Sequence, residues 1–236
     1  GTGALREAPN RADLLVRAWE EAGVSVRVIS GAEEGAFAFR GALGGVRETL
    51  PDTVLLCDVG GASTELVLGQ RSGTVLQSVS VPLGAVRLIE AVNRGDKVED
   101  HLEALRARVK EFVAEAAHLR ERVGLLLGVG GTATTLAAVD QALAVYDPDK
   151  VTGHRISHTH LREWFERLQA MPVDERKKLA GMPAGRADIL PYGLLILDTV
   201  MEAVTPWLDT DEITVSDHDL LQGVIYAMLE AHESKT

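Results

Sequence analysis

The sequence contains one cysteine, no long apolar run and no excess of basic residues, and each shortage excludes a class of protein. Because Cys57 has no second cysteine to pair with, a disulfide-stapled secreted domain is excluded, and we expect a reducing, cytoplasmic location. No apolar stretch reaches the roughly 18–20 residues that cross a membrane, and the first residues carry no secretory signal pattern. We therefore expect no membrane partner.

Basic residues are outnumbered, with 24 lysines and arginines against 35 acids and a formal net charge of −11. A chain this acidic does not coat nucleic acid through phosphate contacts, so we expect no nucleic-acid partner. Any anionic ligand must instead be held by local groups. The 236 residues are enough for one large domain or two small ones.

Strand and helix patterns alternate along the chain, which favours a mixed α/β fold over a solenoid or a coiled coil. Strands are expected at residues 24–30, 53–60, 63–70, 74–84, 124–131 and 212–219. Helices are expected at residues 4–22, 31–43, 85–94, 96–121, 132–146, 158–170 and 220–232, with two more in 174–204 that are broken near Pro183.

A turn rich in small and polar residues joins two of these strands in LLCDVGGASTELVLG, residues 55–69. It contains two carboxylates, two glycines and two hydroxyls, namely Asp58, Glu65, Gly60, Gly61, Ser63 and Thr64. Glycines and exposed N–H groups can wrap a phosphate oxygen, while two flanking carboxylates can hold a magnesium ion through its waters. The alternative is an ordinary β-hairpin with a glycine turn.

A second glycine cluster ends the strand at 124–131 and leads directly into a helix. It comprises Gly128, Gly130 and Gly131, and we expect Thr132 to be the N-cap of the helix that follows. Open N–H groups at a helix start favour an anion, although such turns also serve plain packing. Two loops of this kind suggest two walls of a phosphate cleft.

These segments resemble the exopolyphosphatase and guanosine pentaphosphate phosphohydrolase (Ppx/GppA) family. D-V-G-G-A-S-T-E-L is similar to the family's second phosphate loop, usually D-I-G-G-G-S-T-E-L, and three more segments fit in order, at Thr2–Asn10, Val28–Glu34 and Gly128–Thr132. The resemblance implies an α/β fold of the actin-like, ribonuclease H-like kind, with a mixed sheet flanked by helices. Residues 1–38 would end a first lobe, and residues 39–236 would form a nearly complete second lobe with loops 58–65 and 128–132.

The resemblance also implies roles for individual residues. Asp58 and Glu65 would hold Mg²⁺ (or Mn²⁺), and Glu34 would be the general base that activates water. Phosphate would be bound by the two loops and by an arginine near the cleft, that is, by Gly60, Gly61, Ser63, Thr64, Gly130, Gly131, Thr132 and Arg87. As an isolated residue, Arg87 is equally read as a surface ion pair.

Local sequence helps to choose Glu34 over its neighbour as the base. Ser30 followed by Glu33 predicts a capping box, in which the glutamate turns back to the N-cap N–H. Glu34 then points about 100 degrees away around the helix and is free to face the cleft. The alternative is that both are solvated acids that favour the helix dipole.

Other charged residues carry less information. Arg186 and the pair Lys177 and Lys178 could line a route for a polyanion, and for the two lysines a solvated helix face is the alternative. His154, His158 and His160 lie in a polar connector without zinc-site spacing, so we assign them no role.

Several features depart from the family pattern. Ala62 replaces the usual third glycine of the loop, and Leu221 and Gln222 replace a usual arginine and glutamate. No D-x-G-S-N-S loop, the family's first phosphate clamp, occurs in the 236 residues, and the chain opens without methionine. We therefore expect the native start to lie upstream, and this chain alone to hydrolyse polyphosphate poorly compared with a version extended by about ninety residues.

The sequence favours an exopolyphosphatase-like hydrolase of phosphoanhydride bonds acting on inorganic polyphosphate. Removal of the 5′-terminal phosphate of guanosine pentaphosphate is the nearest alternative. A non-catalytic nucleotide or polyphosphate sensor, or a sugar-kinase-like phosphotransferase, would also retain the glycine loops. The apolar last helix could pack against another lobe or form a homodimer.

Overall fold

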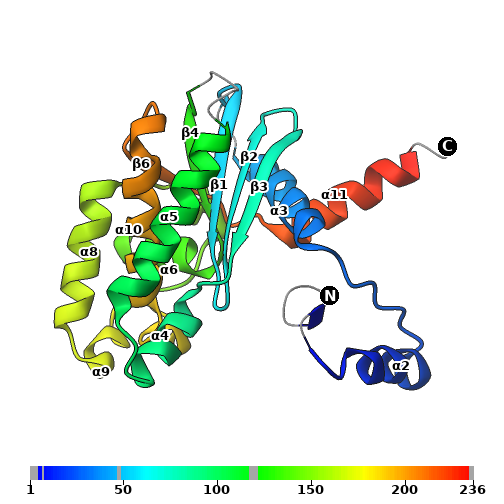
Figure 1. The fold of residues 1–236 in the computed structure, drawn as a ribbon, viewed down its shortest axis with the longest axis horizontal. Coiled ribbons are helices and arrows are strands. Elements are labelled where there is room, and N and C mark those ends of the chain that lie inside the picture. The colour runs from blue at the N-terminus through cyan, green and yellow to red at the C-terminus, as the bar shows by residue number, and fades with distance from the viewer. Residues whose placement is uncertain (1–4, 7, 47–48, 117–121, 234–236) are drawn as a thin grey trace.

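The computed structural model describes residues 5–6, 8–46, 49–116 and 122–233 of the chain, which form a six-stranded mixed sheet flanked by helices (Figure 1). The fold class expected from the sequence is therefore confirmed. The strands are β1 (Thr53–Val59), β2 (Thr64–Gln70), β3 (Val75–Val81), β4 (Leu125–Val129), β5 (Arg155–Ser157) and β6 (Glu212–Val215). The longer helices are α2 (Arg11–Ala22), α3 (Gly31–Gly45), α4 (Ala85–Asn93), α5 (Val98–Ala116), α6 (Gly130–Asp140), α8 (His158–Ala170), α10 (Leu190–Val204) and α11 (Leu220–Glu233). Short helices are α7 (Pro148–Val151), α9 (Val173–Arg176) and two 3₁₀ turns, Ala184–Arg186 and Thr205–Trp207.

The strand order is β3-β2-β1-β4-β6-β5. Strands β1, β2 and β3 form an antiparallel meander, whereas β4 and β6 run parallel to β1. The carboxyl ends of β1, β4 and β6 therefore meet at one edge of the sheet. Open α/β sheets place their ligands at this edge.

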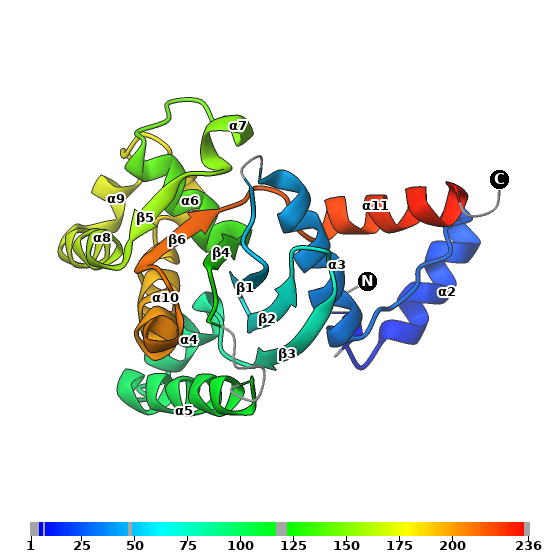
Figure 2. The ribbon, with the colours of Figure 1, turned by 90° about the horizontal axis from the view of Figure 1, so that it is seen from above.

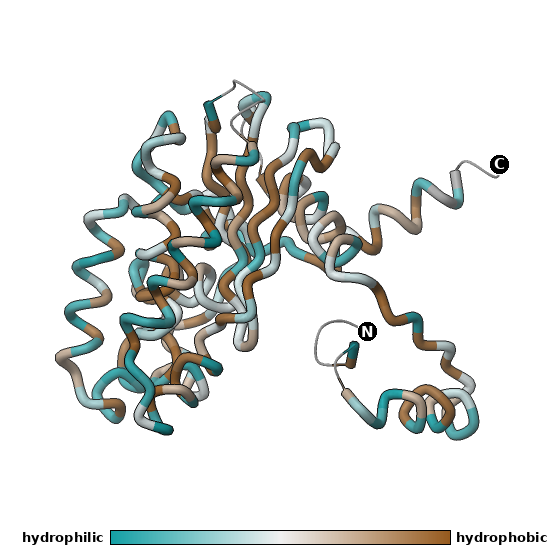
Figure 3. The backbone as a smooth tube through the Cα atoms, in the orientation of Figure 1, coloured by the Kyte–Doolittle hydropathy of each residue, from teal (hydrophilic) through white to brown (hydrophobic). Residues whose placement is uncertain are grey.

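Helices cover the two faces of the sheet unequally. One face carries α3 over a small apolar cluster that includes Phe39, Leu56 and Val67. The other carries α4, α5, α6, α8 and α10 over a larger core, so that the sheet lies between two helical layers (Figure 2). Hydrophobic colour follows the central strands, while the outer helices alternate in colour, as expected for amphipathic helices (Figure 3).

The first helix stands apart from this body. No residue of α2 is buried, and an extended segment, residues 24–30, joins it to α3 (Figure 1). The strand predicted at 24–30 is wrong, because this β-prone segment has no strand to pair with in the described part of the chain. Helix α3 runs continuously through the boundary predicted at residues 38 and 39, and the division into lobes stays a prediction.

Other element boundaries also differ from the sequence prediction. The helix predicted at 4–22 is interrupted at Pro9 and Asn10, and α6 ends at Asp140 rather than at residue 146. The short strand β5 was not predicted, because a three-residue strand has little periodicity and depends on pairing with β6. Residues 117–121 of the helix predicted at 96–121 lie outside the described residues. No helix among the described residues is long and apolar enough to cross a membrane.

A close backbone contact fixes α11 against α3. A β-carbon added to Gly41 would lie 1.8 Å from the Asp219 carbonyl oxygen, and one added to Gly223 would lie 1.8 Å from the Phe37 carbonyl oxygen. The two helices therefore cross at glycines. The outer side of α11 leaves Leu221 and Met228 exposed, and its packing in a homodimer stays a prediction.

We expect Gly223→Ala to destabilise the protein by about 1–3 kcal/mol, because the added methyl group forces two packed helices apart. In an open helix the same change would stabilise, since glycine is a poor helix former. Urea unfolding measures the effect. Gly185→Ala is the matched control, because nothing lies within 4 Å of its added β-carbon. Equal stability of Gly223→Ala and the wild type would contradict this packing.

Candidate functional site

Three carboxylates predicted from the sequence come together at the carboxyl edge of the sheet. Asp58 and Glu65 lie directly opposite each other in the register of β1 and β2. Both face α3, because they alternate along their strands with the same parity as Leu56 and Val67 of the cluster under that helix. Glu34 lies in the first turn of α3, above them.

The charges around Asp58 show how close these groups are. Burial raises the pKa of Asp58 to about 7, with further increases from the charges of Glu65, Asp219 and Glu34 and a decrease from Arg186. Two like charges opposite each other in a sheet destabilise it. Asp58 therefore shares its surroundings with three other acids and requires a proton or a cation to offset the repulsion.

Glu65 lies in a related environment. Burial raises its pKa, and hydrogen bonds from Ser63 and Ser80 lower it. The charge of Glu34 raises the pKa of Glu65 further, while Arg6 lowers it. Glu65 is thus held by two hydroxyls and lies within the electrostatic reach of Glu34.

The capping box predicted at the start of α3 is confirmed. Ser30 accepts a hydrogen bond from the Glu33 N–H at 3.2 Å, and the Glu33 carboxylate accepts one from the Ser30 N–H at 2.9 Å. Glu33 also pairs with Arg27, so it is fully occupied. Glu34 instead forms an ion pair of 3.1 Å with Arg6, whose guanidinium also donates to the Ile29 carbonyl at 2.8 Å.

The first glycine loop is bound tightly to α4. The carbonyl oxygens of Gly60 and Gly61 accept from the first N–H groups of α4 at 2.9–3.0 Å. The Gly60 N–H donates to Ser63 within the turn, and the Thr64 hydroxyl donates to the Leu83 carbonyl at 2.6 Å. In the part of the chain that the structure describes, the N–H groups of Gly61 and Ala62 have no such partner.

The second glycine loop differs from its prediction. Helix α6 begins at Gly130 with Val129 as its N-cap, and no side chain caps it. The predicted N-cap role of Thr132 is wrong, because its hydroxyl donates to the Val59 carbonyl at 2.8 Å and ties α6 to β1. Gly130 has φ +73°, and a β-carbon there would lie 2.2 Å from Asp58 Oδ1. The uncapped start of α6 therefore lies against the Asp58 carboxylate.

Arg186, which the sequence suggested for a polyanion route, reaches this site. A β-carbon added to Gly131 would lie 2.2 Å from Nη2 of Arg186, so the guanidinium lies against the first turn of α6. Arg87, predicted to bind phosphate, donates from Nη1 to the Pro82 carbonyl at 3.1 Å. Lys177 and Lys178 form surface ion pairs with acids of their own helical turn.

We expect Arg186→Ala to lower kcat/KM for a polyanionic substrate about 10- to 100-fold, because a charge-assisted hydrogen bond contributes about 1.5–3 kcal/mol. Steady-state phosphate release by the native protein measures this. Lys178→Ala is the matched control and is expected to change nothing. An unaltered kcat/KM in Arg186→Ala would place this arginine outside the substrate's reach.

The sequence missed three contributors to the site. Arg6 lies in the segment Thr2–Asn10, which resembles the family pattern but in which no single residue was given a role. Asp219 follows β6 among other polar residues, and Ser80 lies on an edge strand. Arg6 and Asp219 come from segments far from residues 55–69 in sequence, whereas Ser80 lies on the next strand of the same meander. Only the strand order and the position of α3 bring them together.

The acids fit a hard divalent cation. No group of three or more histidines, cysteines or acids among the described residues is arranged to hold a metal by itself. Mg²⁺ commonly uses only one or two carboxylates and keeps several waters, which is what a facing Asp58 and Glu65 offer. The mutual repulsion of these acids favours the same ion.

The sequence pattern of the Ppx/GppA phosphatase family matches residues 1–232 of this chain. The chain belongs to the Ppx/GppA phosphatase family. A curated relative, exopolyphosphatase 2 of Mycobacterium tuberculosis, is 33% identical over 237 residues, covering 96% of this chain and 73% of the relative. A bifunctional 3-dehydroquinate synthase/phosphatase of Fusobacterium nucleatum is 28% identical over 241 residues, covering 99% of this chain and 34% of that protein.

Solved structures of the Ppx/GppA family share this fold. A family member from Aquifex aeolicus superposes with a TM-score of 0.79 at 29% identity, covering 98% of this chain and 73% of that one. An exopolyphosphatase from Cytophaga hutchinsonii superposes with a TM-score of 0.76 at 29% identity, covering 98% and 74%. The sheet and its helices thus have the actin-like architecture of the Ppx/GppA proteins.

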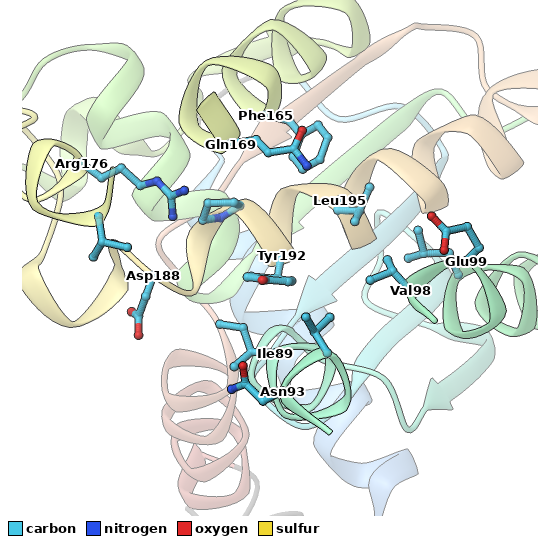
Figure 4. A pocket seen from close by; sticks show the side chains of 14 residues that line it. Ile89, Asn93, Val98, Glu99, Phe165, Gln169, Arg176, Asp188, Tyr192 and Leu195 are labelled. Carbon is cyan, nitrogen blue, oxygen red and sulfur yellow. The ribbon is translucent and has the colours of Figure 1, made fainter. Parts of the chain in front are cut away.

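Three histidines of this Ppx/GppA chain pair with acids other than Asp58, Glu65 and Glu34. His154 and His160 hydrogen-bond to Asp140 at 2.7 and 2.6 Å, and His158 to Asp198 at 2.6 Å. A hollow of about 670 Å³ opens over α10 between α8 and the pair α4 and α5 (Figure 4). None of the predicted site residues lines it.

Proposed function

We propose that the native protein hydrolyses the terminal phosphoanhydride bond of inorganic polyphosphate and releases orthophosphate. The observation that carries the proposal is that Asp58 lies against the uncapped start of α6, faces Glu65 across the sheet and feels the charge of Glu34. Carboxylates at a metal site, a candidate base and open N–H groups are the components that attack of water on a phosphate needs.

In this proposal the chain positions the phosphate and moves one proton. The terminal phosphate binds the N–H groups at the start of α6 and the Arg186 guanidinium. Glu34 accepts a proton as the water oxygen bonds to phosphorus, and the bridging P–O bond breaks to release the shortened chain. Mg²⁺ (or Mn²⁺) on Asp58 and Glu65, when bound, would neutralise the charge that develops on the phosphate oxygens. Phosphate contacts of the threonine hydroxyls and of Arg87 stay predictions.

Polyphosphate is favoured over guanosine pentaphosphate because a relative with 33% identity is named an exopolyphosphatase. We test this by measuring orthophosphate released by the native protein from each substrate with Mg²⁺ present. Faster release from polyphosphate supports the proposal, and faster release from guanosine pentaphosphate assigns the alternative.

A non-catalytic sensor is the second outcome of this assay. It would bind polyphosphate without releasing orthophosphate, and Glu34→Gln would leave its affinity for the polymer unchanged. Turnover by the wild type that depends on Glu34 excludes the sensor. Tight binding without turnover would overturn the hydrolase proposal.

A further inference from the structure

A row of three side chains crosses the sheet at the acids described above. In the strand register, Asp58 of β1 lies opposite Glu65 of β2, and Glu65 lies opposite Ser80 of β3. Facing residues in antiparallel strands have β-carbons about 4.5–5.5 Å apart. The three side chains therefore form one continuous line on the α3 side of the sheet, with Ser80 exposed at the outer end.

Ser80 uses this position to hold Glu65. Its hydroxyl donates to Glu65 Oε1 at 2.8 Å. Ser63 donates to the same carboxylate from the neighbouring turn. Because β3 is the outermost strand of the sheet, the cross-strand partner of Ser80 comes from β2 alone.

We propose that Ser80 is a positioning residue for the divalent cation, acting through the orientation of the Glu65 carboxylate. The inference rests on the metal site of the proposed function. A carboxylate on a strand has several accessible rotamers, and two hydroxyl donors restrict them before the ion arrives. Partners of this kind, one bond removed from a metal, commonly change its affinity 10- to 100-fold.

The test measures Mg²⁺ affinity of the native protein by titration calorimetry at neutral pH, without substrate. Ser80→Ala is expected to raise the Mg²⁺ dissociation constant about tenfold. Ser80→Thr keeps a hydroxyl and is expected to restore it to within about threefold of the wild type. Ser78→Ala is the matched control, since Ser78 lies two residues away on the same face of β3 and is not paired with Glu65.

Each outcome decides the inference. If Ser80→Ala binds Mg²⁺ as tightly as the wild type and Asp58→Asn does not bind it, the inference about Ser80 is overturned. The proposed function then stays intact. If Ser80→Ala has a lower thermal midpoint in EDTA but unchanged Mg²⁺ affinity, the inference is also overturned, because Ser80 then has only a structural role. Wild-type binding by Asp58→Asn removes the metal site and both proposals with it. If Ser80→Ala does not fold, Ser80→Cys, whose thiol is a weak donor, takes its place.

Discussion

Glu34→Gln is expected to lower kcat for polyphosphate hydrolysis by about 10²- to 10⁴-fold, the usual contribution of a positioned general base. The amide has the shape of the carboxylate but cannot accept the proton of the attacking water. Mg²⁺ binding should persist, because Asp58 and Glu65 are unchanged. Orthophosphate release at saturating substrate and Mg²⁺ measures the loss of kcat.

The neighbouring residue provides a close control for this experiment. Glu33→Gln retains the capping box, since glutamine also bonds the N-cap N–H, and its kcat should match that of the wild type. A kcat within about threefold of the wild type for Glu34→Gln would remove this residue as the base.

Asp58→Asn is expected to abolish Mg²⁺ binding and, without metal, to stabilise the protein above neutral pH. Asp58 has a folded-state pKa of about 7 against an ordinary value of 3.8. Between these values the folded chain retains a proton that the unfolded chain releases, so wild-type stability falls as pH rises from about 4 to 7. A difference of this size corresponds to about 4 kcal/mol. The asparagine variant carries no such charge and should lack this decline.

Urea unfolding across pH 4 to 8, with EDTA or with Mg²⁺, measures this effect. Without metal, the two proteins should match near pH 4, and the variant should be the more stable near pH 8. Mg²⁺ should stabilise the wild type alone, because it binds the ionised pair. Asp52→Asn is the control, because Asp52 is an exposed partner of Arg71 at the opposite end of the same strand. A variant that loses stability with pH in parallel with the wild type would contradict the burial of this charge.

Much of the fold follows from local patterns in the sequence. The apolar runs and glycine turns predict β1, β2, β3, β4 and β6, although the predicted strands run three residues past the end of β3 and four past the end of β6. The capping box at Ser30 was readable because both of its partners lie within one turn of helix. Such interactions are encoded locally, so periodicity and capping residues are sufficient to predict them.

Contacts that depend on tertiary structure were not predictable. Thr132 has the residue type of an N-cap, but its hydroxyl bonds β1 instead, because α6 starts at a glycine held against Asp58. Residues 24–30 have the composition of a strand without a neighbouring strand to pair with in the described chain. Arg186 reaches Gly131 across more than fifty residues of sequence, and no local pattern encodes that approach.

The glycine crossing of α3 and α11 has a consequence for the chemistry. Glu34 is carried by α3, whereas Asp58 and Glu65 are fixed in the sheet. In the proposed function, the spacing between the Glu34 base and a cation on Asp58 and Glu65 would therefore depend on how α3 sits on the β-sheet. Replacing Gly223 by a larger residue, at a distance from any reacting atom, would tilt α3. We expect an assay to record this change as lost turnover by a protein that is still folded.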